Sequence, residues 1–348
     1  PQSVKELTSN GHEVLIENNG GFEAGFDDNQ YLSAGAKIVN KAEDIFNDAE
    51  IIVKVKEPLL NEVEMIRENQ IVFTYLHLAA AKELTQGLIN SKGICIAYET
   101  VTDQYGRLPL LAPMSAVAGR MSVQAGAHCL EKNQKGKGLL LGGAPGVESG
   151  TVVILGGGVV GENAAIIATG MQAKVHIVDK SEKRLKELIQ KFGDKIIPQQ
   201  SDNTDFKKLV SNADLLVGGV LIPGAEAPKL VTKDMLKLMK RGSVIVDVAI
   251  DQGGCVENVK PNTHSEPFEI RNGVIISAIA NLPGAVPKTS SIELSTILQN
   301  YIDDLLIEDW FEKYKSNPNL RPSLQIHNGM LLSVEVGDSL SLPVTKLV

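Results

Sequence analysis

Aromatic residues, cysteines and long apolar runs are all scarce in this sequence. Aromatic side chains make up 4% of the 348 residues, and the three cysteines, Cys95, Cys129 and Cys255, lie far apart. An odd number of widely spaced thiols matches neither a disulfide framework nor a metal site, so we expect reduced, mostly buried thiols and no bound metal. No apolar run approaches the roughly 18 to 20 residues of a membrane span, and the N-terminus lacks the pattern of a signal peptide. These absences predict a cytoplasmic protein without a membrane partner.

Clusters of basic residues are also missing. The formal net charge is −8, and Lys and Arg occur singly, which argues against nucleic acid as a partner. Hydrophobic residues make up 43% and charged residues 22% of the chain, as in globular proteins. The length favours two domains. Abundant glycine with few aromatics is typical of α/β proteins, whose cores are built from aliphatic side chains.

The first third of the chain alternates short apolar runs with amphipathic segments. Such alternation predicts a mostly parallel sheet with helices on its faces. The predicted strands are 13–17, 37–39, 51–56, 71–76 and 94–98, and the predicted helices are 41–48, 59–68 and 79–91. Lys56 and His77 then lie at carboxyl ends of strands, the edge at which open α/β sheets bind ligands.

A second alternating series begins near residue 151. Its predicted strands are 152–155, 174–179, 214–217, 243–247 and 274–277. A long helical stretch over 113–133 connects the two series, and 290–314 reads as one amphipathic helix capped by Ser290 or Ser291. The prediction is therefore an α/β protein of two Rossmann-like domains joined by long helices. Residues 1–112 with 288–348 form a substrate domain, and 113–287 form a dinucleotide-binding domain.

The segment 151–179 carries the most specific motif. It reads as a strand, then Gly156, Gly158 and Gly161 in the spacing GxGxxG, then a helix and a strand that ends in Asp179. The first glycine permits a tight turn, the second lets the backbone approach a pyrophosphate, and the third allows close helix packing. Asp179 would accept hydrogen bonds from ribose hydroxyls and repel a 2′-phosphate. The motif predicts NAD binding, although Arg184 downstream could accommodate that phosphate.

Four polar residues follow strands of the two series and could carry chemistry. Lys56, His77, Asp251 and Asn281 together supply a cation, two titratable groups and an amide. Taken singly, each has a structural explanation, because a lysine can simply reach water, a histidine can be a core residue and an aspartate can begin a turn. As a set they suit hydride transfer from a small acid, with Lys binding the carboxylate and His or Asp exchanging protons.

Several separate motifs in the chain resemble those of bacterial L-alanine dehydrogenase, from end to end. They are KVKEP at 54–58, TYLHLA at 74–79, AYET at 97–100, LAPMS at 111–115, 247–254, and ANLP at 280–283. The resemblance implies reversible oxidative deamination of L-alanine by NAD to pyruvate, ammonium and NADH. It also implies a cytoplasmic homohexamer.

Carried over by position, the resemblance implies roles for individual residues. His77 and Asp251 would exchange protons, and the substrate would be bound by Lys56, Asn281, Met114 and Tyr98. Besides Gly156 and Gly161, the NAD site would be lined by Ser115, Gly158, Val159, Asp179, Arg184, Ser201, Val220, Leu221, Val248, Ala249, Ile250, Asp251, Ile279, Ala280, Asn281 and Leu282.

The start of the sequence departs from the pattern that the resemblance implies. A strand and a carboxylate-binding arginine are expected before the position of Pro1. Because a bidentate arginine contact is strong and orienting, we expect little activity from a protein without this N-terminal segment. Two alternatives stay open: the soluble NAD-binding subunit of proton-translocating transhydrogenase, and a truncated NAD-binding protein with little activity.

Overall fold

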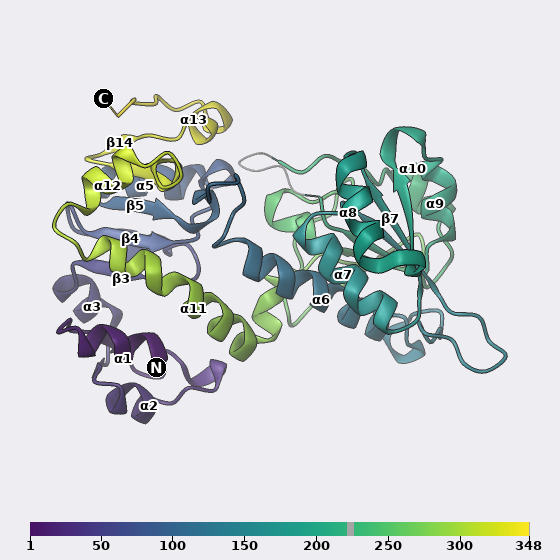
Figure 1. The fold of residues 1–348 in the computed structure, drawn as a ribbon, viewed down its shortest axis with the longest axis horizontal. Helices are drawn as coiled ribbons and strands as arrows, with labels where there is room; N and C mark the ends of the chain where they lie inside the picture. Colours follow the sequence, from purple (N-terminus) through teal and green to yellow (C-terminus); the bar gives the residue numbers. More distant parts are fainter. Residues whose placement is uncertain (221–225, 348) are drawn as a thin grey trace. The chain divides into compact units, whose positions relative to one another are not determined.

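The computed structural model describes residues 1–220 and 226–347, and the chain divides into two compact units (Figure 1). The first unit comprises Pro1–Pro113 with Val286–Val348, and the second comprises Met114–Ala285. Both contain parallel strands with helices packed on the sheet. The expected α/β fold with mostly parallel sheets is confirmed.

The first unit is built around a five-stranded sheet in the order β14-β13-β5-β4-β3. Its strands are β3 (Ile51–Val53), β4 (Ile71–Thr74), β5 (Ile94–Ala97), β13 (Leu324–His327) and β14 (Met330–Leu331). The first three are parallel, while β13 pairs antiparallel to both β5 and β14. Every residue of β4 and β5 is buried, which explains their continuous apolar runs. The sequence thus indicated the central strands, whereas β13 and β14 were not predicted.

The first unit also contains a smaller sheet and several helices. A separate parallel pair is formed by β1 (Leu15–Glu17) and β2 (Lys37–Val39). The helices are α1 (Gln2–Ser9), α2 (Asp28–Ser33), α3 (Ala42–Asp48), α4 (Leu60–Val63), α5 (Lys82–Ser91), α11 (Pro287–Leu305), α12 (Trp310–Ser316) and α13 (Val334–Leu340).

The prediction of one helix over 290–314 is wrong. The helix α11 begins at Pro287, whose missing N–H costs nothing at a first helical position, and its N-cap is Val286 rather than a serine. The chain leaves the helix at Leu306 and starts α12 at Trp310. Amphipathic spacing runs through both helices, so periodicity alone could not reveal the break.

The second unit contains a seven-stranded sheet in the order β11-β12-β10-β9-β6-β7-β8. The strands are β6 (Thr151–Leu155), β7 (Lys174–Asp179), β8 (Ile196–Gln200), β9 (Leu215–Gly218), β10 (Val244–Asp247), β11 (Glu269–Arg271) and β12 (Val274–Ser277). All pairings are parallel except β11 with β12. The order reverses at β6, which lies between β7 and β9. A crevice at the carboxyl end of such a strand is the usual ligand site of this fold.

The edge strand β8 was not predicted from the sequence. Its burial is partial, and it contains Pro198 opposite Ile177 of β7. Proline has no N–H to donate to a neighbouring strand, so it is tolerated in an edge strand. In the sequence, however, a proline argues against a strand.

The helices of the second unit are α6 (Ala112–Cys129), α7 (Val159–Gly170), α8 (Glu182–Phe192), α9 (Phe206–Asn212) and α10 (Lys233–Leu238). The helix α6 starts in the first unit and continues into the second. A side chain at Gly119 of α6 would overlap the backbone carbonyl of Val160, so these two segments approach at backbone distance. Small residues along α6 permit this packing.

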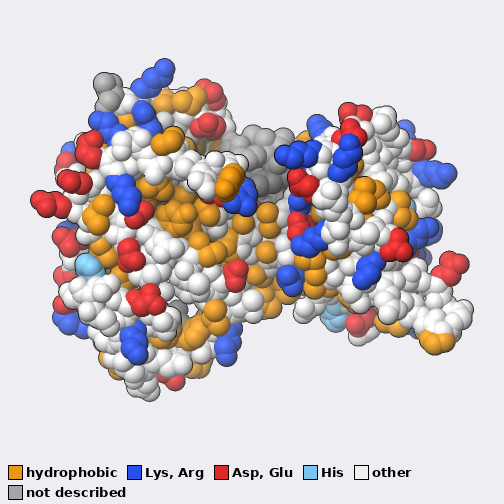
Figure 2. Space-filling view, viewed as in Figure 1, with side chains coloured by type: hydrophobic (Ala, Val, Ile, Leu, Met, Phe, Trp, Pro, Cys, Tyr) orange, Lys and Arg blue, Asp and Glu red, His pale blue; other side chains and the backbone are white. Residues whose placement is uncertain are grey.

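The three cysteines are buried and unpaired, as expected. Burial raises the pKa of the Cys95 thiol to about 12, so it stays a neutral core residue. On the face in Figure 2, Lys and Arg side chains are interspersed with Asp and Glu. No helix among the described residues is long and apolar enough to span a membrane.

Candidate functional site

The glycine motif forms the turn between β6 and α7. Gly156 has φ +97°, a conformation that suits glycine, and its N–H donates to the Val178 carbonyl at 2.8 Å. A Cβ at Gly156 would lie 2.9 Å from the Gly219 carbonyl oxygen. The turn is therefore clamped between the ends of β7 and β9, at the point where the strand order reverses.

The other two glycines of the motif have different local constraints. A Cβ at Gly161 would overlap the carbonyl oxygen of Gly156, so α7 packs against the turn only because that side chain is absent. Gly158 is the N-cap of α7, and a Cβ there would meet no atom within 4 Å. The position of that Cβ is therefore open space beside the N-terminus of α7, whose partial positive charge favours an anion.

Asp179 ends β7 beside the glycine turn. Its Oδ2 accepts from the Gly157 N–H at 2.7 Å, and its Oδ1 accepts from the Ser181 N–H at 2.8 Å. Two backbone donors thus hold the carboxylate in one orientation. A carboxylate at this place is the group that would accept the ribose hydroxyls of a dinucleotide.

Arg184 is engaged with protein partners. Its Nε donates to the Gly157 carbonyl at 2.6 Å, and its other nitrogens pair with Glu162 of α7 and with Glu187. Fork-shaped guanidinium contacts of this kind orient as well as bind. The side chain that could have accommodated a 2′-phosphate instead ties α8 to the glycine turn.

The segment after β10 is held by a buried aspartate. The carboxylate of Asp247 accepts from the N–H groups of Cys255 and Val256 at 2.9 and 3.1 Å. Burial raises the pKa of this carboxyl, while the hydrogen bonds oppose that shift. Between these anchor points the chain forms the 3₁₀ turn Val248–Gln252, which exposes Asp251. Asp247 therefore shapes the segment that presents Asp251.

Asp251 and Asn281 meet in the structure. Asp251 Oδ1 accepts from the Asn281 N–H at 3.2 Å, and Asn281 has φ +58°, a left-handed conformation that asparagine tolerates well. The Asn281 carbonyl is 3.1 Å from His264 Nε2. Segments that follow two neighbouring strands, β10 and β12, are thus joined at the carboxyl edge of the sheet.

Lys56 and His77 follow β3 and β4 in the first unit, with Glu57 between them. Glu57 Oε2 is 3.5 Å from Lys56 Nζ and 3.8 Å from His77 Nδ1. The neighbouring Lys54, on the same strand segment, pairs instead with Glu62. Because β3 and β4 are parallel neighbours, their carboxyl ends bring the two candidate side chains to one carboxylate.

His77 is also held through its backbone. Its φ is +48°, and the Glu99 carboxylate accepts from the N–H groups of Leu76 and His77, the latter at 2.7 Å. The ring stacks on Tyr75 with the centroids 5.9 Å apart. A carboxylate that satisfies two N–H groups stabilises a backbone conformation which a non-glycine residue seldom adopts.

Tyr98 is placed differently from the substrate role that the resemblance implied. Its side chain is 0% exposed and packs edge-on against Phe73 and Tyr75. Because the ring is sealed in the core of the first unit, it supports the strand ends rather than presenting a hydroxyl to a ligand.

The remaining candidates lie at the expected strand ends or in α6. Met114 and Ser115 are in the first turns of α6, Val159 begins α7, Ser201 follows β8, Val220 follows β9, and Ile279, Ala280 and Leu282 follow β12. Leu221 lies outside the described residues.

The comparisons with known proteins identify the family. The model for "Alanine dehydrogenase/PNT, N-terminal domain" matches residues 1–118, and the model for the corresponding C-terminal domain matches residues 122–333. The chain belongs to the alanine dehydrogenase/PNT family.

Individual relatives span nearly the whole chain. It is 46% identical to an alanine dehydrogenase of Halomonas elongata over 98% of this chain and 92% of the relative. The corresponding enzyme of Methanococcus maripaludis is 48% identical over 99% of this chain and 93% of the relative. A solved L-alanine dehydrogenase structure superposes with a TM-score of 0.91 at 44% identity, covering 98% of this chain and 94% of that one.

These alignments also test the expectation that the N-terminal segment of the family is missing. The matches cover 98 to 100% of this chain and at least 92% of the alanine dehydrogenases. The expectation is therefore not borne out. A solved transhydrogenase from Sinorhizobium meliloti is 23% identical with a TM-score of 0.77, a likeness that shows the shared fold alone.

Two members of the candidate site were not singled out from the sequence. Glu57 directly follows Lys56, and Glu99 lies within the AYET motif. A carboxylate beside a lysine normally reads as a solvated surface pair. Only the folded structure, in which the ends of β3, β4 and β5 lie side by side, shows that both carboxylates contact His77.

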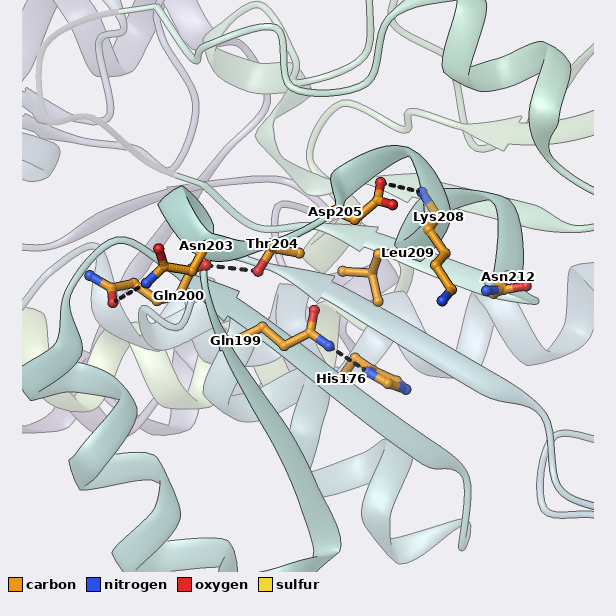
Figure 3. Close-up of a pocket in the computed structure, with 9 residues that line it drawn as sticks. All are labelled: His176, Gln199, Gln200, Asn203, Thr204, Asp205, Lys208, Leu209 and Asn212. Atoms are coloured by element: carbon orange, nitrogen blue, oxygen red, sulfur yellow. Dashed lines mark hydrogen bonds between the residues drawn. The ribbon is translucent and has the colours of Figure 1, made fainter.

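A groove of about 420 Å³, lined mostly by polar side chains, lies in the second unit beside α9 (Figure 3). His176 and Gln199 come from β7 and β8 and contact each other at 3.2 Å, while Lys208 comes from α9. Gln200 and Asn203 also line the groove, so it lies next to the segment that contains Ser201. None of the candidate catalytic side chains lines it.

Proposed function

We propose that this protein is an L-alanine dehydrogenase. It would convert L-alanine, NAD⁺ and water to pyruvate, ammonium, NADH and a proton, reversibly. The observation that carries the proposal is the match of nearly the whole chain to alanine dehydrogenases at 46 to 48% identity. The geometry of both units agrees with the chemistry that this reaction needs.

The second unit would bind NAD. Gly156, Gly158 and Gly161 leave the start of α7 open for the pyrophosphate, and Asp179 would accept the adenosine ribose hydroxyls. A second set would line the remainder of the dinucleotide: Ser115, Val159, Arg184, Ser201, Val220, Leu221, Val248, Ala249, Ile250, Asp251, Ile279, Ala280, Asn281 and Leu282. When bound, NAD supplies the hydride acceptor for the substrate Cα.

The first unit would bind the amino acid. The ammonium of Lys56 would hold the substrate carboxylate and polarise the carbonyl of pyruvate, and Met114 would contribute to the pocket. His77 would take a proton from the water that attacks the imine and would return it to the departing ammonia. Asp251, held beside Asn281, is the second proton-exchanging group. We also propose that the protein acts in the cytoplasm as a homohexamer, as the family resemblance implies.

The activity assay is direct. Purified protein is expected to reduce NAD with L-alanine, followed by NADH absorbance, and to release pyruvate in equal amount. The reverse reaction is expected with pyruvate and ammonium. NAD binding without turnover in either direction contradicts the proposal.

Asp179 determines the expected cofactor preference. Asp179→Asn removes the charge that repels a 2′-phosphate while keeping the size of the side chain, so the ratio of kcat/KM for NAD to that for NADP should fall about tenfold or more. Steady-state kinetics with both cofactors measure this ratio. Asp194→Asn, which neutralises an exposed carboxylate between α8 and β8, is the charge-matched control and should leave the ratio unchanged. An unaltered ratio in Asp179→Asn would contradict the assignment.

A further inference from the structure

Glu57 lies between two groups that the proposed chemistry requires. One oxygen, Oε2, is 3.5 Å from the Lys56 ammonium and 3.8 Å from His77 Nδ1. The side chain is 37% exposed overall, but this oxygen is buried. A carboxylate oxygen shielded from water and flanked by two cationic groups has little reason to be there unless those groups use it.

Glu57 Oε2 also accepts no hydrogen bond within the part of the chain that the structure describes. Both neighbours are at ion-pair distance, so a small rotation of the imidazole would bring Nδ1 into hydrogen-bond range. Interaction with His77, followed by that of its own backbone and of Lys56, holds the pKa of Glu57 at about 2 although burial opposes this shift. The group is therefore a full negative charge at every pH at which an enzyme of this type works.

Two other groups that contact His77 are engaged with partners of their own. Glu99 is engaged with the N–H groups of Leu76 and His77, so it holds the backbone. Tyr75 stacks on the ring, and its hydroxyl donates to the Leu110 carbonyl. Lys56 is a cation and disfavours a second positive charge nearby. Glu57 places a carboxylate oxygen 3.8 Å from Nδ1 of the same ring.

We propose that Glu57 is the positioning residue of His77: its carboxylate orients the imidazole through Nδ1 and stabilises the protonated ring during proton exchange with substrate or water. This inference rests on the proposed function, because it assigns Glu57 to the proton exchange of that reaction. The same carboxylate limits the repulsion between Lys56 and a protonated His77. A purely structural carboxylate would pair with Lys56 at the strand end and leave the protonation of His77 unchanged.

The sign of the expected effect follows from the charge. An anion next to the imidazole raises the affinity of the ring for a proton, and opposite charges at this range shift a pKa by about 1 to 3 units. Neutralising Glu57 should therefore move the titration of His77 to lower pH. At neutral pH less of the histidine would carry the proton that pyruvate reduction consumes.

The kinetic test uses Glu57→Gln and the pH dependence of kcat/KM for pyruvate in the full-length enzyme. The limb that reports loss of the His77 proton should move to lower pH by about one unit or more, with kcat reduced at least tenfold at pH 8. Glu62→Gln is the matched control, because it removes a carboxylate from the same segment that pairs with Lys54 and not with His77. Its pH profile should match that of the wild type.

A measurement without turnover separates this inference from the proposed function. In protein labelled with ¹³C at the histidine rings, the His77 signal is the one of six that disappears in His77→Asn. Its titration midpoint should fall by about one unit in Glu57→Gln and stay near the wild-type value in Glu57→Asp, which keeps the charge. This result supports the inference even if L-alanine proves not to be the substrate.

The inference is overturned if the His77 midpoint in folded Glu57→Gln equals that of the wild type. It is also overturned if Glu57→Gln and Glu57→Asp lose activity equally with unshifted pH profiles, because that result describes a structural side chain. If Glu57→Gln fails to fold, Glu57→Asp is compared with the wild type instead. An unchanged His77 titration midpoint and an unchanged pH profile of kcat/KM support the role of the charge. A lowered midpoint contradicts it.

Discussion

Replacing His77 by asparagine is expected to lower kcat for L-alanine oxidation by about 10² to 10⁴-fold, the usual contribution of a positioned acid–base group. Asparagine is the informative substitution, because it tolerates the positive φ of 48° at this position and so preserves the backbone that Glu99 holds. It cannot take up a proton at neutral pH. The loss should therefore appear in kcat and leave NADH binding unchanged.

Initial rates with L-alanine and NAD, together with NADH titration by fluorescence, measure the two effects separately. His128→Gln is the control, because His128 is exposed, lies in the second unit and pairs with Glu131 just after the end of α6. Its kinetics should match those of the wild type. Turnover within tenfold of wild type in His77→Asn would remove the acid–base role from this residue.

Replacing Gly161 by alanine is expected to abolish measurable NAD binding and to destabilise the second unit by about 1 to 3 kcal/mol. The added methyl group would overlap the carbonyl oxygen of Gly156, a backbone atom that cannot rotate away as a side chain would. Either α7 moves off the sheet or the turn opens, and both displace the N–H groups that would meet the pyrophosphate. The effect on binding should thus exceed what the lost stability alone produces.

Calorimetric titration with NADH and thermal unfolding with and without NADH measure both quantities. Gly170→Ala is the matched control, because Gly170 ends the same helix and a Cβ there would meet no atom within 4 Å. That variant should bind NADH normally and be equally or slightly more stable, since alanine is the better helix former. Normal NADH affinity in Gly161→Ala would show that the close packing at the turn is not needed for the cofactor.

The hydrophobic pattern of the sequence predicted those strands that are marked by a continuous run of apolar residues. Fully buried parallel strands such as β4, β5, β6 and β10 appear as continuous apolar runs, and all four are present near the predicted positions. The pattern failed where tertiary context overrides it. The break between α11 and α12 keeps amphipathic spacing, and β8 carries a proline that only an edge strand accepts.

For the candidate site, spacing along the chain indicated which residue types follow strands, but not which of them touch. Lys56 and His77 are more than twenty positions apart, and their shared contact with Glu57 depends on the parallel pairing of β3 and β4. Tyr98 shows the reverse case, since a polar residue in a promising motif lies sealed in the core. Neighbouring residues in sequence point to opposite sides of a strand, so exposure is decided by the sheet.

The sequence by itself determined the α/β class, the glycine turn with its acidic partner at the end of the next strand, and the family. These features can be recognised from short stretches of sequence, because each depends on the types and spacing of residues that lie near one another in the chain. Only the tertiary structure decided that Glu57 faces His77, that Glu99 holds its backbone and that Asp247 anchors the segment presenting Asp251. The contacts of Glu57 and Glu99 with His77 join segments that follow different strands, so the register and packing of the folded sheet create them, whereas the Asp247 contacts close the loop after β10.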